Sequence, residues 1–161
     1  MEIDLALLAK QPFLKGLPER HLSVLAKNSM PAAFKTDEFI FYEGDPANRF
    51  YLILEGRIGL EAPIDEDGFR KGAVQIETIG AGDVLGWSWL FPPYYWHFDA
   101  RAVTPARAIF FYGTALREQC ERDHDLGYEL MKRLSEVVIN RLQMTRQQML
   151  KHEHRPLATP L

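Results

Sequence analysis

The chain has one cysteine, no excess of basic residues and no long apolar run. A single cysteine excludes a disulfide framework and a Cys-based metal site, and Cys120 lies in a mixed-charge stretch with no catalytic neighbours, so we expect it to be inert. With 19 Lys and Arg against 22 Asp and Glu, the net charge of −3 gives no overall attraction to nucleic acid or to an anionic membrane. The first residues hold no signal or spanning segment. We therefore expect a cytoplasmic protein with no membrane association.

Signals for catalysis and for bound cofactors are weak. Ser88 lacks the glycine frame of a hydrolase nucleophile. The glycine-rich stretch 80–86 imitates a dinucleotide fingerprint, but Leu85 stands where the third glycine belongs and no βαβ unit follows. His152 and His154 have no third metal ligand in view. The sequence therefore predicts no enzyme, no cofactor and no metal.

The spacing of the apolar residues changes along the chain and divides it into three parts. With 161 residues, 47% of them hydrophobic, we expect one domain covering 1–151 and a flexible tail at 152–161. Leucine spacing predicts short helices over about 5–29. Short apolar runs separated by glycine and proline turns predict an antiparallel sandwich or barrel over about 32–112. A helical period returns over about 114–151.

Two segments carry a resemblance to a known family. Residues Glu38 to Pro46 and Phe50 to Leu60 resemble the barrel core of cyclic-nucleotide-binding domains of the bacterial catabolite-activator (Crp/Fnr) superfamily. The resemblance implies a mainly β fold, a double-stranded β-helix jelly-roll barrel with short N-terminal helices and a long C-terminal helix. Gly44 and Gly56 would then occupy sharp turns that require a positive φ.

The segment that holds the nucleotide in that family is altered here. A Gly-Glu pair begins this cassette in the family, with Glu on the ribose, and nine residues later an Arg pairs with the phosphate and is followed by small residues. Here Gly86 is followed by Trp87 in place of Glu, Trp96 in place of Arg, and His97 and Phe98 in place of the small residues. An indole N–H is one neutral donor and cannot replace the bidentate guanidinium. We therefore expect that cyclic AMP and cyclic GMP are not held in the usual way.

Two residues keep an anionic ligand open as an alternative. A protonated His97 or the nearby Arg101 could hold a nucleotide or another anion in a rearranged pose. The competing interpretation makes His97 a core or rim histidine hydrogen-bonded to Asp99 or to backbone, and Arg101 a solvent-facing strand residue.

The aromatic cassette admits three interpretations: the rings fill the former pocket, line it for a flat apolar ligand, or form a docking surface. Tryptophan and tyrosine favour interfaces, because they bury much area and keep a polar atom for the rim. We expect some rings to fill the pocket and the others to form a docking surface, with the exposed rings among Trp89, Tyr94, Tyr95 and Trp96. The candidate residues for pocket or docking are Gly86, Trp87, Ser88, Trp89, Tyr94, Tyr95, Trp96, His97, Phe98 and Arg101.

The C-terminal helix carries a mostly apolar stripe at three- and four-residue steps, completed by Thr145, which is typical of a coiled-coil seam. We expect it to pair two copies of the chain or to bind a partner helix; packing back onto the barrel is the alternative. Its members are Met131, Leu134, Val138, Leu142 and Met149, opposite a mixed-charge face that includes Arg133 and Arg141. In the family a DNA-reading domain follows this helix. Only ten residues follow Lys151, so we expect no direct DNA binding.

The cassette also resembles that of the small accessory subunits of bacterial NAD-reducing nickel–iron hydrogenases. This resemblance implies a non-catalytic regulatory subunit that docks on a redox enzyme complex, with a degenerate cyclic-nucleotide pocket. The alternative is a free sensor of a small molecule or nucleotide that signals through its C-terminal helix. A transcription regulator is the third possibility.

Overall fold

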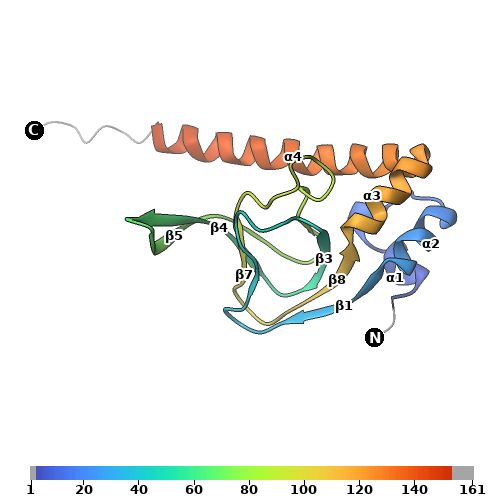
Figure 1. The fold of residues 1–161 in the computed structure, drawn as a ribbon, viewed down its shortest axis with the longest axis horizontal. Helices are drawn as coiled ribbons and strands as arrows, with labels where there is room; N and C mark the ends of the chain where they lie inside the picture. Colours follow the sequence, from blue (N-terminus) through green and yellow to red (C-terminus); the bar gives the residue numbers. More distant parts are fainter. Residues whose placement is uncertain (1–2, 154–161) are drawn as a thin grey trace, which may run out of the picture.

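The protein is a β-barrel with helices at both ends of the chain, as a computed structural model that describes residues 3–153 shows (Figure 1). The N-terminal helices are α1 (Leu5–Ala9), the 3-10 turn η1 (Pro12–Leu14) and α2 (Glu19–Lys27). The strands are β1 (Ser29–Phe34), β2 (Phe39–Phe41), β3 (Arg49–Glu55), β4 (Ile58–Glu66), β5 (Phe69–Ile79), β6 (Val84–Leu85), β7 (Asp99–Ala102) and β8 (Ala106–Tyr112). Helices α3 (Gly113–Arg122) and α4 (His124–Glu153) follow. The predicted mainly β barrel with flanking helices is confirmed.

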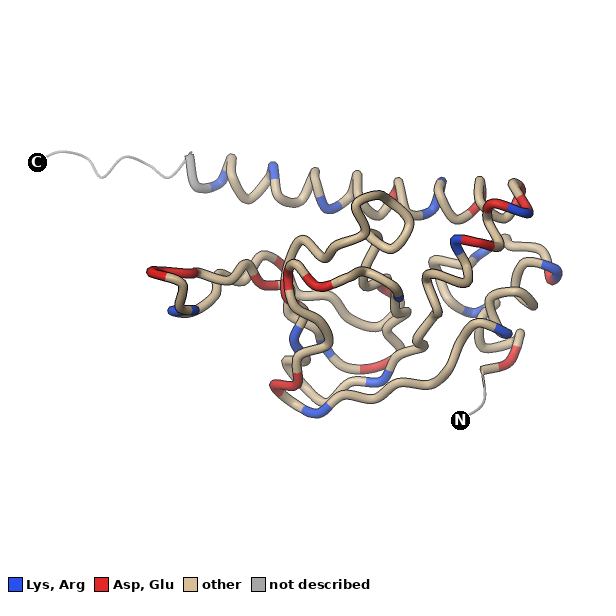
Figure 2. Tube along the Cα trace, in the orientation of Figure 1, with Lys and Arg blue, Asp and Glu red and all other residues tan. Residues whose placement is uncertain are grey.

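The strands form two four-stranded antiparallel sheets, in the orders β1-β8-β3-β6 and β2-β7-β4-β5. Strand β8 pairs with both β1 and β3, although it lies far from both of them in the sequence. Strand β5 is an edge strand, and it forms with β4 a hairpin that projects from the barrel (Figure 1). Figure 2 shows charges of both signs dispersed along the described chain, including the tip of this hairpin.

Two of the predicted glycine turns are confirmed. Gly44 and Gly56 have φ of 88° and 91°, the left-handed region that side chains disfavour. At Gly56 a side chain is excluded for a second reason, because an added Cβ would lie 2.4 Å from the carbonyl oxygen of Pro105.

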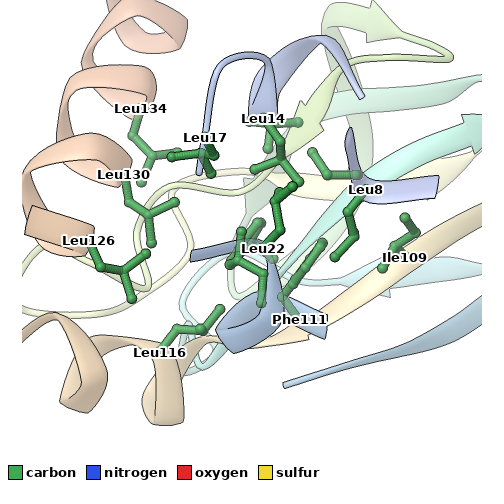
Figure 3. Close-up of a cluster of buried hydrophobic side chains, with 14 of the residues drawn as sticks. Leu8, Leu14, Leu17, Leu22, Ile109, Phe111, Leu116, Leu126, Leu130 and Leu134 are labelled. Atoms are coloured by element: carbon green, nitrogen blue, oxygen red, sulfur yellow. The ribbon is translucent and has the colours of Figure 1, made fainter. Parts of the chain in front are cut away.

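The core has two parts on opposite sides of the first sheet. One lies inside the barrel, and the other joins the outer face of that sheet to the helices. In this second part, Leu126, Leu130 and Leu134 of α4 point toward leucines of the N-terminal segment (Figure 3). Helix α4 is therefore held on its own chain over its first half.

The second half of α4 extends past the barrel in the direction of the β4–β5 hairpin (Figure 1). Residues 142–151 are all exposed, and Leu142 and Met149 expose 68% and 61% of their surface. The helix continues to Glu153, so the first two residues of the predicted tail at 152–161 are helical; the rest lies outside the described residues. Within residues 3–153, no helix is both long and apolar enough to span a membrane.

Candidate functional site

The aromatic cassette connects β6 to β7 and is fixed to the loop that follows β2. The backbone N–H of Trp96 donates to the carbonyl of Asp45 at 3.0 Å, and the N–H of Gly44 donates to the carbonyl of Trp96 at 2.9 Å. The N–H of Ala47 donates to the carbonyl of Tyr94 at 2.7 Å. These bonds hold the second half of the cassette against the mouth of the barrel.

Trp96 occupies the barrel interior. Its ring is stacked on Phe41, with centroids 3.8 Å apart and planes 7° apart, and the residue is only 2% exposed. Gly86 accommodates it, because a Cβ at that position would lie 2.8 Å from the Trp96 ring. The residue expected at the phosphate position is therefore part of the core.

Phe98, close to Trp96 at the C-terminal end of the cassette, closes the same space. Its ring lies 5.7 Å from that of Phe41 and 5.6 Å from that of Trp87, and the residue is buried. The interior is thus packed by Phe41, Trp96 and Phe98 together with aliphatic residues of both sheets. The cassette fills its own pocket, which is the first of the three interpretations.

Trp89 is buried on the other side of the first sheet. It is fully buried and stacked on Phe50, with centroids 4.8 Å apart. Its carbonyl accepts a hydrogen bond from Nη1 of Arg117 at 2.6 Å, and the guanidinium carbon of Arg117 lies 3.8 Å from the centre of the Tyr94 ring. Arg117 of α3 therefore ties the cassette to the helices.

The predicted exposure of the docking rings is wrong for Trp89 and Trp96. Tyr95 is 47% exposed and Tyr94 is half-buried. The polar atoms that favour tryptophan at an interface are here inside the protein, since the indole N–H groups of Trp89 and Trp96 are buried with no hydrogen-bond partner among the described residues. Stacking on Phe50 and Phe41 offsets this cost.

Arg101 lies outside the barrel in a network of charges. Its guanidinium binds Oε1 of Glu61 at 2.6 and 3.0 Å and Oδ1 of Asp37 at 2.6 Å. Hydrogen bonding to Glu61 raises the pKa of Arg101 above its ordinary value. Arg70 extends the network, binding Asp99 at 2.6 Å and approaching Glu61 at 3.8 Å. Arg101 therefore lies on the outer face of β7, as the competing interpretation expects, but it is paired with Glu61 and Asp37 and is not free for a phosphate.

His97 is exposed, and its predicted hydrogen bond to Asp99 is not formed. The Oδ1 of Asp99 instead accepts from the backbone N–H of Glu43 at 2.7 Å, and its Oδ2 faces Arg70. His97 is a rim residue at the outer surface of the cassette.

Two arginines that the sequence did not assign to the site contact the cassette. Arg49 of β3 lies over Trp96 at 5.9 Å, and it donates to the hydroxyl of Tyr51, to the carbonyl of Ile40 and to the side chain of Asn48. Burial raises the pKa of the Tyr51 hydroxyl, and Arg49 acts in the opposite direction. The guanidinium of Arg49 is thus used within the protein.

Arg141 of α4 is the second. Its side chain is 12% exposed, donates to the carbonyl of Val84 at 2.8 Å, faces Glu77 at 3.5 Å and lies 4.6 Å from the Trp87 ring centre. Burial lowers its pKa. The sequence placed Arg133 and Arg141 on a mixed-charge face opposite the apolar stripe, and the structure shows that the side chains of both are largely covered, each 12% exposed. No local signal distinguishes a buried arginine here.

The predicted helix seam is divided. Leu134 is fully buried in its own core (Figure 3), so its assignment to a pairing face is wrong. Val138 is half-buried, and Met131, Leu142 and Met149 are exposed. An apolar stripe that no described residue covers fully therefore runs along α4 beside its buried stripe.

The filled barrel and its cassette define a class of protein. The sequence profile of the cyclic nucleotide-binding domain matches residues 31–123, and the chain belongs to this family. No arrangement of three or more metal-binding side chains occurs among the residues that the structure describes.

Three relatives illustrate the family. A crystal structure described as a cyclic nucleotide-binding protein of Geobacter metallireducens is 30% identical, with a TM-score of 0.77 over 87% of this chain and 98% of that one. The CRP-like cAMP-activated global transcriptional regulator of Mycobacterium tuberculosis is 28% identical over 141 residues, 86% of this chain and 58% of the regulator. Cyclic nucleotide-gated ion channel 1 of Arabidopsis thaliana is 32% identical over 82 residues, 51% of this chain and 11% of the channel. The chain thus spans little more than half of the regulator's length.

Proposed function

We propose that this chain is a non-catalytic regulatory module that does not bind a cyclic nucleotide in the pose usual for its family. It acts by binding a protein partner through α4. The observation that carries the proposal is the burial of Trp96 in the barrel, stacked on Phe41 at 3.8 Å. A ligand in the barrel would have to displace this ring and that of Phe98.

Charge supports the same conclusion. A buried phosphate needs charge-assisted hydrogen bonds. Arg101 is bound to Glu61 and Asp37, and Arg49 is bound to Tyr51, Asn48 and a backbone carbonyl. Either guanidinium would have to leave charged or buried partners before it could hold a phosphate, at a cost of about 1–3 kcal/mol for each partner left unsatisfied.

The surface for the partner is the exposed stripe of α4. Coiled-coil pairing places apolar residues on one side of a helix with a seven-residue repeat, and the pairs Met131–Val138 and Leu142–Met149 are each seven residues apart on the side of α4 that stays at least partly uncovered. The partner is a second copy of the chain or a helix of another protein. The accessory-subunit prediction, with a redox enzyme such as an NAD-reducing hydrogenase as the partner, rests on the cassette resemblance.

Calorimetry tests the ligand half of the proposal. Titration of the full chain with cyclic AMP and with cyclic GMP should give no saturable binding in the micromolar range. Saturation at about 1 μM, which corresponds to a binding free energy of roughly 8 kcal/mol, would overturn it, because a nucleotide would then displace the aromatic rings from the barrel interior.

Capture of partners tests the docking half. The tagged chain is expressed in its own host, and co-purifying proteins are identified by mass spectrometry. A stoichiometric redox-enzyme subunit that is lost in Leu142→Asp and retained in Tyr95→Ala supports the accessory-subunit prediction. Loss with Tyr95→Ala alone would instead assign docking to the cassette and overturn the assignment to α4.

A further inference from the structure

A hollow of about 480 Å³ lies between the cassette and α4, outside the filled barrel. Its walls include Trp87, Ser88, Phe91 and His97 of the cassette and Val138 and Ile139 of α4. None of its lining residues belongs to a strand, so it is separate from the space that Trp96 and Phe98 fill. Its volume falls in the range of about 300–1,000 Å³ that small-molecule sites occupy.

The walls are aromatic and aliphatic. The indole of Trp87 and the ring of Phe91 stand on the cassette side, and Val138 and Ile139 stand on the helix side. Trp87 is held in place by the edge-on ring of Phe98 and by the guanidinium of Arg141. Flat rings bind between such surfaces by stacking and by burial of apolar area.

Two polar side chains of the hollow have no hydrogen-bond partner among the described residues. The hydroxyl of Ser88 is one of them, and because it is not among the buried polar atoms that lack a partner, water reaches its oxygen from the hollow. The hydroxyl can therefore donate to an acceptor on a ligand in place of water. His97 adds a second donor at the rim, and none of the lining residues is acidic. An acceptor with negative charge therefore meets two donors and no repulsion.

We propose that this hollow binds a small aromatic carboxylate, with its ring between Trp87 and the aliphatic side chains of α4 and its carboxylate on Ser88 and His97. The ligand would contact the cassette and the helix at once. Since Val138 belongs to the exposed stripe of α4, occupancy of the hollow bears directly on the surface proposed for the partner. The inference does not depend on that partner, because the hollow lies within one chain.

The test uses nuclear magnetic resonance on the full chain, labelled with ¹⁵N at tryptophan, with 2-naphthoate as the probe. Three tryptophans give three indole N–H signals. The Trp87 signal should move and saturate, while those of the buried Trp89 and Trp96 stay in place. Cyclohexanecarboxylate, which has the charge without the aromatic ring, should bind at least tenfold more weakly.

Matched variants locate the site. Phe91→Ala should weaken naphthoate at least tenfold, and Ser88→Ala about fivefold, the loss of one hydrogen bond. Tyr95→Ala, an exposed ring of the same cassette that does not line the hollow, should leave affinity unchanged. The unshifted Trp89 signal reports that each variant is folded.

Three results would overturn the proposal. Movement of the Trp96 signal without that of Trp87 would place the probe in the barrel. Absence of a saturable shift in the native chain would exclude the site. Binding that occurs only in Leu142→Asp would show that a second copy covers the hollow in the native protein.

Discussion

Trp96 and Phe41 lie face to face inside the barrel, with ring centroids 3.8 Å apart and planes 7° apart. Because Trp96 is nearly fully buried, Trp96→Ala should lower the free energy of unfolding by about 3–5 kcal/mol, measured by urea denaturation. Its sequence neighbour Tyr95 is the control, since it is 47% exposed and Tyr95→Ala should change stability by no more than about 0.5 kcal/mol. Equal effects of the two substitutions would contradict the placement of Trp96 in the core.

The burial of Trp96 beside an exposed Tyr95 could not be predicted from the sequence. Trp87 and Trp96 stand at the ribose and phosphate positions of the family cassette, and from this the loss of the usual ligand chemistry was predicted. Whether the rings point into the barrel or out of it depends on Phe41 and Gly86, which provide a stacking surface and room only once the strands are assembled. The barrel itself was predictable, because turn glycines such as Gly44 and Gly56 mark its corners locally.

The charge network outside the barrel predicts coupled effects on stability. Glu61 is 6% exposed and accepts two hydrogen bonds from Arg101, so Arg101→Ala should destabilise the fold by about 1–3 kcal/mol. The double variant Arg101→Ala with Glu61→Gln should recover part of that loss, because the buried charge is removed together with its partner. Additive losses in this double-mutant cycle would show that the two side chains do not interact.

A matched control for this network lies on the hairpin. Lys71 faces Glu66 at 4.0 Å, and both side chains are more than half exposed. Lys71→Ala should therefore change the free energy of unfolding by less than about 1 kcal/mol.

Arg117 should control the local mobility of the cassette. It donates to the carbonyl of Trp89 at 2.6 Å and covers the ring of Tyr94, whose φ of 62° is unfavourable for a residue with a side chain. Arg117→Leu removes the hydrogen bond and the cation–π contact and keeps an apolar stem. Hydrogen–deuterium exchange should then increase in the peptide that covers residues 87–96, while exchange in β3 stays unchanged. Faster exchange throughout the barrel would mean that Arg117 supports the whole fold and not the cassette.

Cys120 should be protected from alkylation. Burial, together with Asp123 and Glu121, raises the pKa of its thiol from 9.0 to about 11. The thiolate is the reactive form, so at about pH 8 iodoacetamide should modify the folded chain about 100-fold more slowly than the urea-denatured chain. Because the unfolded thiol ionises first as pH rises from about 9 to 11, this group also lowers stability over that range. Mass spectrometry over a pH series measures the rate, and coincident pH profiles for folded and denatured chains would contradict the burial of Cys120.

Helix α4 shows a second limit of sequence analysis. Its apolar positions form two adjacent stripes, one through Leu126, Leu130 and Leu134, the other through Met131, Val138 and Leu142. The three- and four-residue steps that identify a seam can pass from one stripe to the other, so the spacing alone assigned Leu134 to the wrong one. The N-terminal helices decide between them, because Leu8, Leu14 and Leu22 contribute to the cluster that buries Leu134 (Figure 3).

The two stripes predict opposite consequences for the same substitution. Leu134→Asp places a charge in the core and should unfold the chain or lower its melting temperature strongly, because the carboxylate has no partner there. Leu142→Asp adds a charge to a side chain that is 68% exposed, so the folded monomer should keep its melting temperature. If α4 pairs two copies, Leu142→Asp should lower the mass measured by light scattering toward that of one chain, 18.6 kDa. A chain that is already monomeric, or a Leu142→Asp variant that keeps the full oligomer mass, would contradict self-pairing through this stripe, and the exposed apolar side chains of α4 would then be left to a different protein.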